Sequence, residues 1–494
     1  MKKILSVFLS FSMLLSCTPV TSFAATEENT VITTSGSAES YPFILIRGVD
    51  FGALYSNYGT PEQEKAVDSI TAGGVASALL KAIGSGIIHF STESAVEEII
   101  KYAGNVLGKL GCNKDGTPVY DLGLDRFPLN VSNYEAKLIK GGGRGAEEGI
   151  VKSSSERYGA NNVYYFTYDW RLNPLDLCDE INDMVNLALS EHITSKVNIV
   201  CASMGGIEGV AYLTKYGYDK VNKLVFISST LCGTYIVSDL FCGRLSVAEP
   251  ALFNFLDDKT DGNKFMNFVV NTLYKTGVLK LVSGFANKFI DKYKDKVYNE
   301  FLTDTFGTMP IWWGLLQPED YDEAINYMFG GREDEYAGII AISKELQTML
   351  AGRDRLLKDA AANGVKISIV ANYNSATMPI FERAYANSDG GLETALVSGG
   401  ATVADYGKTL DDSYVSSNTA FVSPDNVIDA STCLFPDSTW LVKDGEHVAC
   451  SYGTEYSDFL FWLIDFAGRP TVYSNTRYPQ FMISGSGQTL ASLS

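Results

Sequence analysis

The chain has 494 residues, of which 46% are apolar, and it carries a formal net charge of −19. This length can form a large hydrophobic core, in one elaborated domain or in two. The negative charge argues against nucleic acids and anionic membrane surfaces as partners, because their phosphate groups would be repelled.

The N-terminus has the pattern of a secretory signal. A lysine pair precedes the apolar run at residues 4–15, and small residues follow at 22–25. Residues 1–24 therefore resemble a cleavable signal peptide that is too short to span a membrane, and we expect a secreted protein with a disordered lead over residues 25–40. An alternative remains open, because the residues ending at Cys17 resemble a lipoprotein processing box, which would anchor the protein through that cysteine.

Short apolar runs alternate with helical patterns along much of the chain. Buried strands are predicted at residues 41–46, 162–168, 197–200, 223–228, 365–371 and 439–442, and helices at 177–189, 207–216 and 458–466. Strands that alternate with helices at this spacing indicate an α/β protein with a mainly parallel sheet and right-handed crossovers.

Residues 235–365 interrupt this alternation with amphipathic helical runs. We interpret them as a helical cap over the carboxyl edge of the sheet, where ligands bind in open α/β sheets. Trp312 and Trp313 lie in this segment, and we expect them to pack in the cap's own core; an acyl pocket or a lipid surface are the alternative contacts. The predicted organisation is a core at residues 41–234 with a helical insertion at about 60–110, the cap at 235–365, a second core segment at 366–467 that ends with the last strand and helix, and a loosely held tail at 468–494.

Residues 201–206 read Cys-Ala-Ser-Met-Gly-Gly between a predicted strand and a predicted helix. A strand that turns sharply into a helix with a serine at its tip has the geometry of a nucleophile elbow, which needs small residues two positions before and two positions after the serine. Gly205 and Cys201 fill these positions, so Ser203 is the candidate nucleophile.

A serine hydroxyl needs a base, usually a histidine held by a carboxylate. Of the three histidines, His89 lies in the N-terminal insertion, and His192 precedes the Ser203 strand and so belongs to the opposite end of the sheet. His447 follows the last predicted strand and emerges at the same edge as Ser203. His447 is therefore the predicted base.

Two aspartates compete for the third position. Asp389 is the first good candidate beyond the strand that ends near residue 371, and we prefer it. Asp425 lies 22 residues before His447 and remains open, although Ser423 and the proline after it also fit the start of a short helix, where an acid is favoured.

Three motifs resemble the lecithin:cholesterol acyltransferase-like branch of the α/β-hydrolases. They are residues 168–172 (Tyr-Asp-Trp-Arg-Leu), the elbow at 203–206 and residues 226–230 (Phe-Ile-Ser-Ser-Thr). The resemblance covers about 70 residues, 162–234, and implies an α/β-hydrolase fold with a triad built on Ser203 and His447.

The same resemblance assigns roles to two further groups. The strand before residue 47 breaks into a glycine-containing loop whose backbone N–H groups can donate to an oxyanion. The donors implied by the family are the N–H groups near Val49 or Asp50, together with that of Met204. Asp169 and Arg171 are expected to form a buried ion pair that shapes the site.

These observations predict a secreted serine hydrolase that cleaves carboxylic esters, with a lipid-like small molecule as substrate and no metal or organic cofactor. The cap would offer a transient contact with a lipid surface. Two alternatives are an acyltransferase that passes the acyl group to an alcohol with the same triad, and a non-catalytic surface or binding protein on a degenerate hydrolase scaffold.

Overall fold

The computed structural model describes residues 41–50, 53–67, 100, 104, 107–140, 146–260, 262–450 and 452–494. The predicted signal peptide, the lead and Cys17 lie outside these residues, as does most of the helical insertion predicted near 60–110. β2 (Tyr55–Ser56), just before that segment, pairs in antiparallel register with β3 (Glu64–Lys65), which lies within it.

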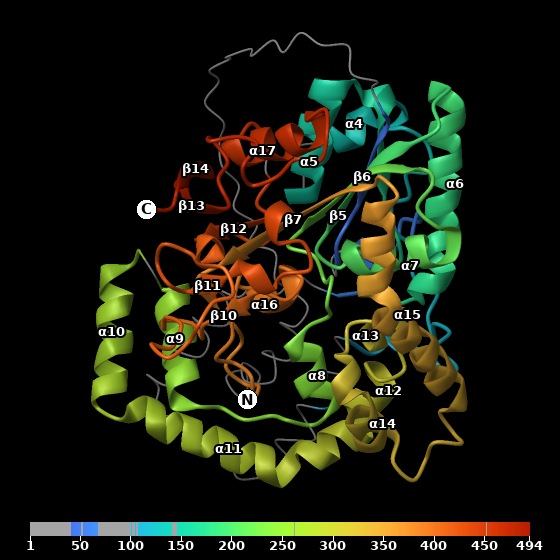
Figure 1. Cartoon of the computed structure of the whole chain (residues 1–494). Helices are drawn as coiled ribbons and strands as arrows, with labels where there is room; N and C mark the ends of the chain where they lie inside the picture. The colour runs from blue at the N-terminus through green and yellow to red at the C-terminus, as the bar shows by residue number, and fades with distance from the viewer. Residues whose placement is uncertain are drawn as a thin grey trace.

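An eight-stranded sheet forms the centre of the molecule (Figure 1). Its spatial order is β14 (Thr489–Ser492), β13 (Phe481–Gly485), β12 (Thr439–Lys443), β7 (Lys366–Tyr373), β6 (Val221–Ile227), β5 (Val197–Ala202), β1 (Phe43–Ile46) and β4 (Val163–Phe166). Every neighbouring pair is parallel except β13 and β14. The predicted α/β class with a mainly parallel sheet is confirmed.

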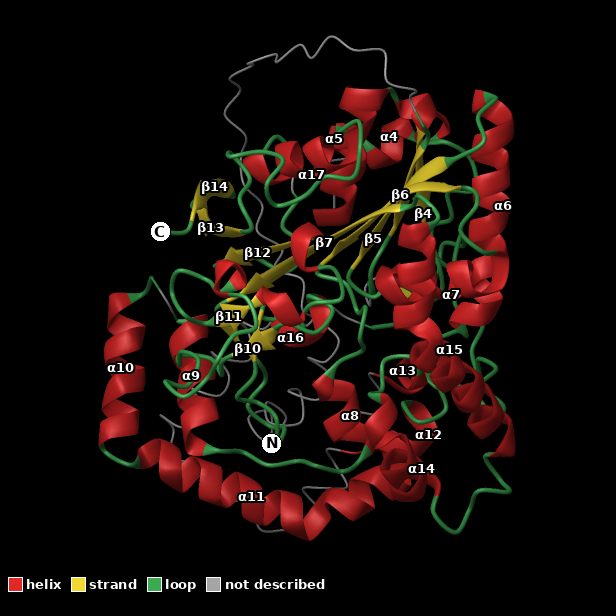
Figure 2. Cartoon of the chain, viewed as in Figure 1, coloured by secondary structure: helices red, strands yellow, loops and turns green. Residues whose placement is uncertain are grey.

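Both faces of the sheet are buried, as the continuous apolar strands require. In β1, Ile44 and Ile46 join the cluster that contains α6 (Pro174–His192) and α7 (Gly205–Tyr216). Phe43 and Leu45, which alternate with them, join the cluster on the other face with α5 (Ala146–Tyr158) and α17 (Glu455–Asp465). Figure 2 shows these two helical layers on either side of the strands.

Every described regular element between β6 and β7 is helical, as predicted. The α-helices of four or more residues are α8 (Tyr235–Phe241), α9 (Glu249–Lys259), α10 (Lys264–Lys275), α11 (Val278–Val297), α13 (Pro310–Trp313), α14 (Tyr321–Phe329) and α15 (Ala337–Ala362). Trp312 and Trp313 are buried, and the Trp313 indole donates to the Gly307 carbonyl at 2.8 Å. Neither tryptophan is positioned to touch a lipid surface.

The prediction of a loosely held tail at 468–494 is wrong. β13 extends the sheet beyond β12, and β14 closes that edge in antiparallel register. Phe481 and Met482 supply the buried side chains for this extension. The glycines and serines around them hide the apolar pattern of a short strand pair in the sequence. The predicted last strand, β12, is therefore followed by two more.

The short helix predicted from Ser423 is also absent from the structure. Residues 423–427 form a turn in which Ser423 Oγ accepts hydrogen bonds from the N–H groups of Val427 and Ile428, at 3.0 and 2.9 Å. A serine before a proline can cap a turn as well as a helix, because both present unpaired N–H groups to its oxygen. In the described part of the chain, no helix combines the length and apolarity needed to cross a membrane.

Candidate active site

Ser203 occupies the sharp turn between β5 and α7. Its φ of 50° lies in the left-handed region, which a residue with a side chain adopts only when the surrounding structure imposes it. The Ser203 N–H donates to the Ile227 carbonyl at 3.1 Å, and the Ser203 carbonyl accepts from the Thr230 N–H at 2.9 Å. The motif at residues 226–230 thus holds the elbow from the neighbouring strand.

The small residues around Ser203 have separate structural reasons. A Cβ atom on Gly205 would lie 2.5 Å from the Ile46 carbonyl oxygen, so β1 can approach only because residue 205 is glycine. A Cβ atom on Gly209 would lie 2.5 Å from the sulfur of Cys201. The cysteine at the minus-two position is therefore accommodated by a glycine one turn further along α7.

His447 joins Ser203 to Asp389. Its Nε2 lies 2.8 Å from Ser203 Oγ, and its Nδ1 lies 2.8 Å from Asp389 Oδ2. The other carboxylate oxygen of Asp389 accepts from the N–H groups of Gly391 and Leu392, at 2.9 and 2.8 Å. The three groups are largely buried: the side chains of His447 and Asp389 are 8% and 1% exposed, and Ser203 is 7% exposed.

The charges of this pair support each other. Burial disfavours the imidazolium, but the charge of Asp389 and its hydrogen bond outweigh burial and raise the pKa of His447 above 6.5. Burial also opposes ionisation of Asp389, yet His447 and the two backbone N–H groups hold its pKa below the ordinary value of 3.8. Asp389 is therefore an anion that can orient His447 and stabilise its protonated form.

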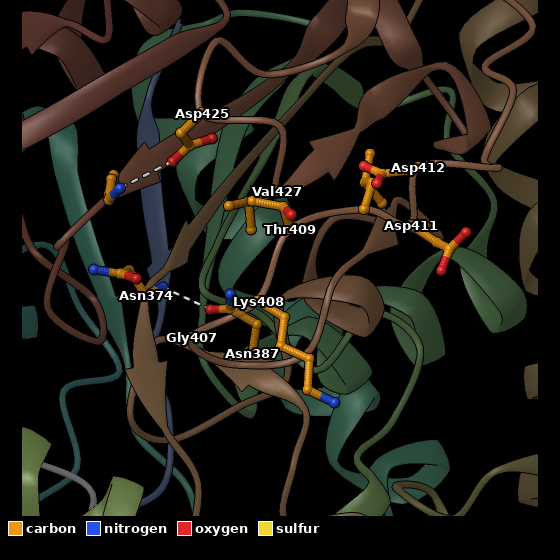
Figure 3. Close-up of a pocket in the computed structure, with 11 residues that line it drawn as sticks. Asn374, Asn387, Gly407, Lys408, Thr409, Asp411, Asp412, Asp425 and Val427 are labelled. Carbon is orange, nitrogen blue, oxygen red and sulfur yellow. Dashed lines mark hydrogen bonds and ion pairs between the residues drawn. The ribbon is translucent and has the colours of Figure 1, made fainter.

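Asp425, the alternative acid, does not contact His447. Its carboxylate accepts from the Tyr373 hydroxyl and from Lys443, both at 3.0 Å. It lines a polar cavity of about 650 Å³ outside the triad, together with Asn374 and Lys408 (Figure 3). The structure brings Asp389, rather than Asp425, to the histidine.

The second described histidine lies elsewhere, as predicted. His192 is the last residue of α6, and its Nε2 lies 3.2 Å from the Tyr164 hydroxyl and 3.1 Å from the Asn161 carbonyl oxygen. His89 lies outside the described residues.

The loop after β1 runs directly past Ser203. A Cβ atom on Gly48 would lie 2.6 Å from the Cβ of Ser203. Arg47 braces the loop through an ion pair with Asp50 at 2.8 Å, and its carbonyl accepts from the Tyr168 hydroxyl at 3.1 Å.

The expected oxyanion donors lie in this loop and at the start of α7. Val49 is half-buried and packs against the core, and Asp50 sits beside it. Within the described residues, no backbone carbonyl accepts a hydrogen bond from the Met204 N–H. The first amides of a helix have no partner within the helix, so the Met204 N–H is suited to an anion next to Ser203.

The predicted ion pair between Asp169 and Arg171 is present and buried. Arg171 Nε and Nη2 donate to the two carboxylate oxygens at 2.9 and 2.6 Å, and its remaining bonds go to the carbonyls of Lys109 and Tyr120. Arg171 therefore ties the segment after β4 to the chain around residues 109–120.

Sequence reasoning missed Asn372, which is fully buried near the end of β7. Its amide nitrogen donates to the Glu446 carbonyl at 2.7 Å, one residue before His447, and to Ser228 Oγ at 3.3 Å. Its amide oxygen accepts from the Tyr456 hydroxyl, and its own carbonyl accepts from Thr394. β7 also contains Lys366 and Ser368, so the asparagine did not stand out in the sequence as a functional residue.

A second missed residue is Glu147 on α5. Its carboxylate lies 3.2 Å from the position of a Cβ on Gly48, and its charge adds to the elevation of the His447 pKa. The site thus contains a second acid near the histidine, which does not bond to it.

One group in the described part of the chain has donor atoms close enough to hold a metal ion: Cys242, Asp320 and Glu323. Arg244 already occupies it, since it donates to Asp320 Oδ1 at 2.7 Å and to Glu323. The arginine supplies the positive charge that a cation would otherwise bring.

Comparison with known proteins finds no matching family model and no matching curated protein.

Proposed function

We propose that this chain is a secreted serine hydrolase of the α/β-hydrolase type, which cleaves carboxylic esters with a lipid-like acyl group. The observation that carries the proposal is the line of contacts from Ser203 Oγ through both nitrogens of His447 to Asp389, each 2.8 Å long. This arrangement supports nucleophilic catalysis, because the same imidazole can take the serine proton and hold the resulting charge against a buried carboxylate.

In the proposed reaction, Ser203 attacks the ester carbonyl while His447 accepts its proton at Nε2. The N–H of Met204, with those of Val49 or Asp50, would donate to the oxyanion. His447 then gives its proton to the departing alcohol. In the second half, water attacks the acyl-enzyme carbonyl while His447 takes its proton, and His447 returns the proton to Ser203 Oγ as the carboxylic acid leaves. Asp389 remains ionised throughout.

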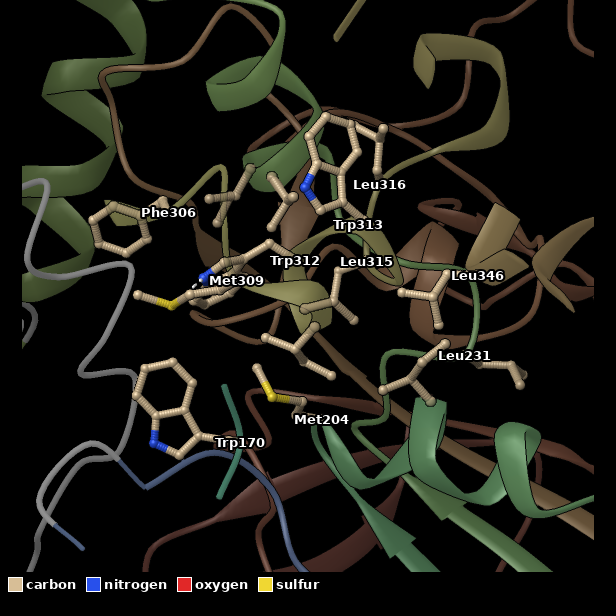
Figure 4. Packing of buried hydrophobic residues seen from close by; sticks show 14 of the residues in the cluster. Trp170, Met204, Leu231, Phe306, Met309, Trp312, Trp313, Leu315, Leu316 and Leu346 are labelled. Atoms are coloured by element: carbon tan, nitrogen blue, oxygen red, sulfur yellow. Dashed lines mark hydrogen bonds between the residues drawn. The ribbon is translucent and has the colours of Figure 1, made fainter. Parts of the chain in front are cut away.

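The apolar surroundings of the elbow favour a lipid-like acyl chain. Figure 4 shows Met309, Trp312 and Leu315 from the helical insertion above Met204 and Trp170. The rings of Trp170 and Trp312 are 6.0 Å apart, edge to face. In the proposal, residues 235–365 act as a cap, and this layer is the wall that would receive the acyl chain.

The test is a series of p-nitrophenyl esters of increasing chain length, given to the wild type and to Ser203→Ala. The proposal predicts hydrolysis by the wild type, faster on medium or long chains than on acetate, and background rates for the variant. An added alcohol shows whether the acyl group goes to water or to an alcohol acceptor. Equal rates for the two proteins would reject the hydrolase and favour the non-catalytic alternative.

A further inference from the structure

The helices α10 and α11 form an outer arm of the molecule, residues 264–297 (Figure 1). α10 packs against α9 and α11, and Val270, Leu279 and Phe289 of the arm are buried. α9, which precedes the arm, ends beside the loop that carries Asp389: a Cβ on Gly390 would lie 3.5 Å from the Nζ of Lys259, the last residue of α9.

Four large apolar residues of this arm are exposed. Phe265 and Phe268 are 71% and 69% exposed, and Leu281 and Phe285 are 63% and 45% exposed. Spacings of three and four residues place each pair on one face of its helix. An exposed phenylalanine forgoes the stabilisation that burial of its ring would give. Exposed apolar pairs on peripheral helices therefore mark a surface that binds a partner or a membrane.

The charge of the arm is opposite to that of the rest of the chain. It contains seven lysines and two aspartates, a net charge of +5, so the remaining residues carry −24. Lys280 and Lys288 are exposed on α11, on either side of Phe285. Charges act over about 8 to 10 Å at physiological ionic strength, so a surface touching the arm responds to its lysines more than to the distant acids.

We propose that the arm of residues 264–297 docks on an anionic lipid surface, with Phe265, Phe268, Leu281 and Phe285 entering the interface and the lysines contacting the headgroups. Exposed aromatic residues beside lysines on an amphipathic helix are the features that bind such interfaces. The whole-chain charge predicted no anionic membrane partner, but that average conceals a basic segment. The inference deepens the proposed function, because it supplies a route to a lipid-like substrate; the docking itself needs no catalysis.

The experiment measures co-sedimentation of the Ser203→Ala protein with vesicles of phosphatidylcholine, alone or with about one third phosphatidylglycerol. We expect at least about tenfold stronger binding to the anionic vesicles, weakened by 0.5 M salt. Each lysine near an anionic leaflet contributes roughly fivefold, so Lys280→Glu with Lys288→Glu should weaken anionic binding by at least about 25-fold. Phe265→Ser with Phe268→Ser should weaken binding to both vesicles by at least about tenfold.

The matched control is Val415→Ser with Tyr473→Ser, two highly exposed apolar residues (87% and 69%) outside the arm. It should bind like its parent. Equal binding to neutral and anionic vesicles, binding that survives the arm substitutions, or no binding would overturn the inference. Association of the protein with itself that the phenylalanine substitutions abolish would overturn it too, because the arm would then be an interface between copies.

Ester hydrolysis separates this inference from the proposed function. The same substitutions made in the Ser203 protein should leave hydrolysis of a soluble butyrate ester within about twofold, since none touches the triad. Vesicle binding without any hydrolysis would reject the hydrolase and keep the arm; hydrolysis without vesicle binding would do the reverse.

Discussion

The contact between Cys201 and Gly209 gives a sharp test of how the elbow is built. In Gly209→Ala, the new methyl group would lie 2.5 Å from the Cys201 sulfur. Ordinary contacts between such atoms are about 3.5 to 4 Å, so β5 and α7 must separate by about 1 Å. Ser203 lies between the two residues in sequence, in the turn that joins β5 to α7, so this separation would displace it.

The expected magnitude has two opposing parts. Overpacking a core costs about 1 to 3 kcal/mol, whereas alanine is favoured over glycine in a helix by about 1 kcal/mol. Gly209→Ala alone should therefore destabilise the protein or leave it unchanged. In a Cys201→Gly background the clash disappears, and the same substitution should stabilise the protein by about 1 kcal/mol.

The assay is a double-mutant cycle of unfolding free energies, measured with urea, with kcat on a soluble ester as a second readout. The predicted coupling between the two positions is about 1 to 3 kcal/mol. The single Gly209→Ala variant should also lose about 10- to 100-fold in kcat, because a shift of about 1 Å in a reacting group has that effect. Additive free energies within about 0.3 kcal/mol would refute this explanation of how the elbow accommodates a cysteine.

Four further predictions concern charged and polar groups around the site. Asp389→Asn should lower kcat by about 10³- to 10⁴-fold while Asp425→Asn stays within about threefold, and the reverse order in steady-state assays would reassign the acid. The raised pKa of His447 means that kcat/KM of the wild type should fall as the pH drops through a value above 6.5, since the protonated ring cannot accept the serine proton; an acid limb below 6.5 would contradict this. Asn372→Leu should lower kcat by about 10- to 100-fold with KM nearly unchanged, because the His447 loop loses its anchor, and an unchanged kcat would show that the anchor is dispensable. Glu208 is fully buried on α7, neither of its carboxylate oxygens is hydrogen-bonded among the described residues, and burial raises its pKa well above 4.5. Above about pH 4.5 the unfolded wild type loses this proton while the folded wild type keeps it, so the free energy of unfolding of Glu208→Gln should rise relative to wild type by up to about 1.4 kcal/mol per pH unit. A difference in urea unfolding that does not change with pH would contradict this prediction.

Much of the fold could be predicted from local patterns. Strands that are buried on both faces read as continuous apolar runs, and the sequence places Ser203 and His447 at the ends of two of them. The sheet order then brings both to one edge. The prediction of a loose tail was wrong because Phe481 and Met482 stand among glycines and serines. That segment becomes a strand only through its pairing with β12.

The site was less predictable where it depends on tertiary contacts. Asp389 and Asp425 both follow β7 in the sequence at plausible distances, and the spatial path of the loop decides which one meets His447. The accommodation of Cys201 by Gly209, the anchoring role of Asn372 and the approach of Glu147 each join residues from different elements. No local pattern encodes such contacts.

The most direct test of the proposed serine nucleophile is covalent labelling with a fluorophosphonate, followed by intact-mass measurement and peptide mapping. The proposed chemistry predicts a single adduct on Ser203, absent in Ser203→Ala and formed far more slowly in His447→Ala. A wild-type protein that forms no adduct, or one that is labelled equally after Ser203 is removed, would contradict it.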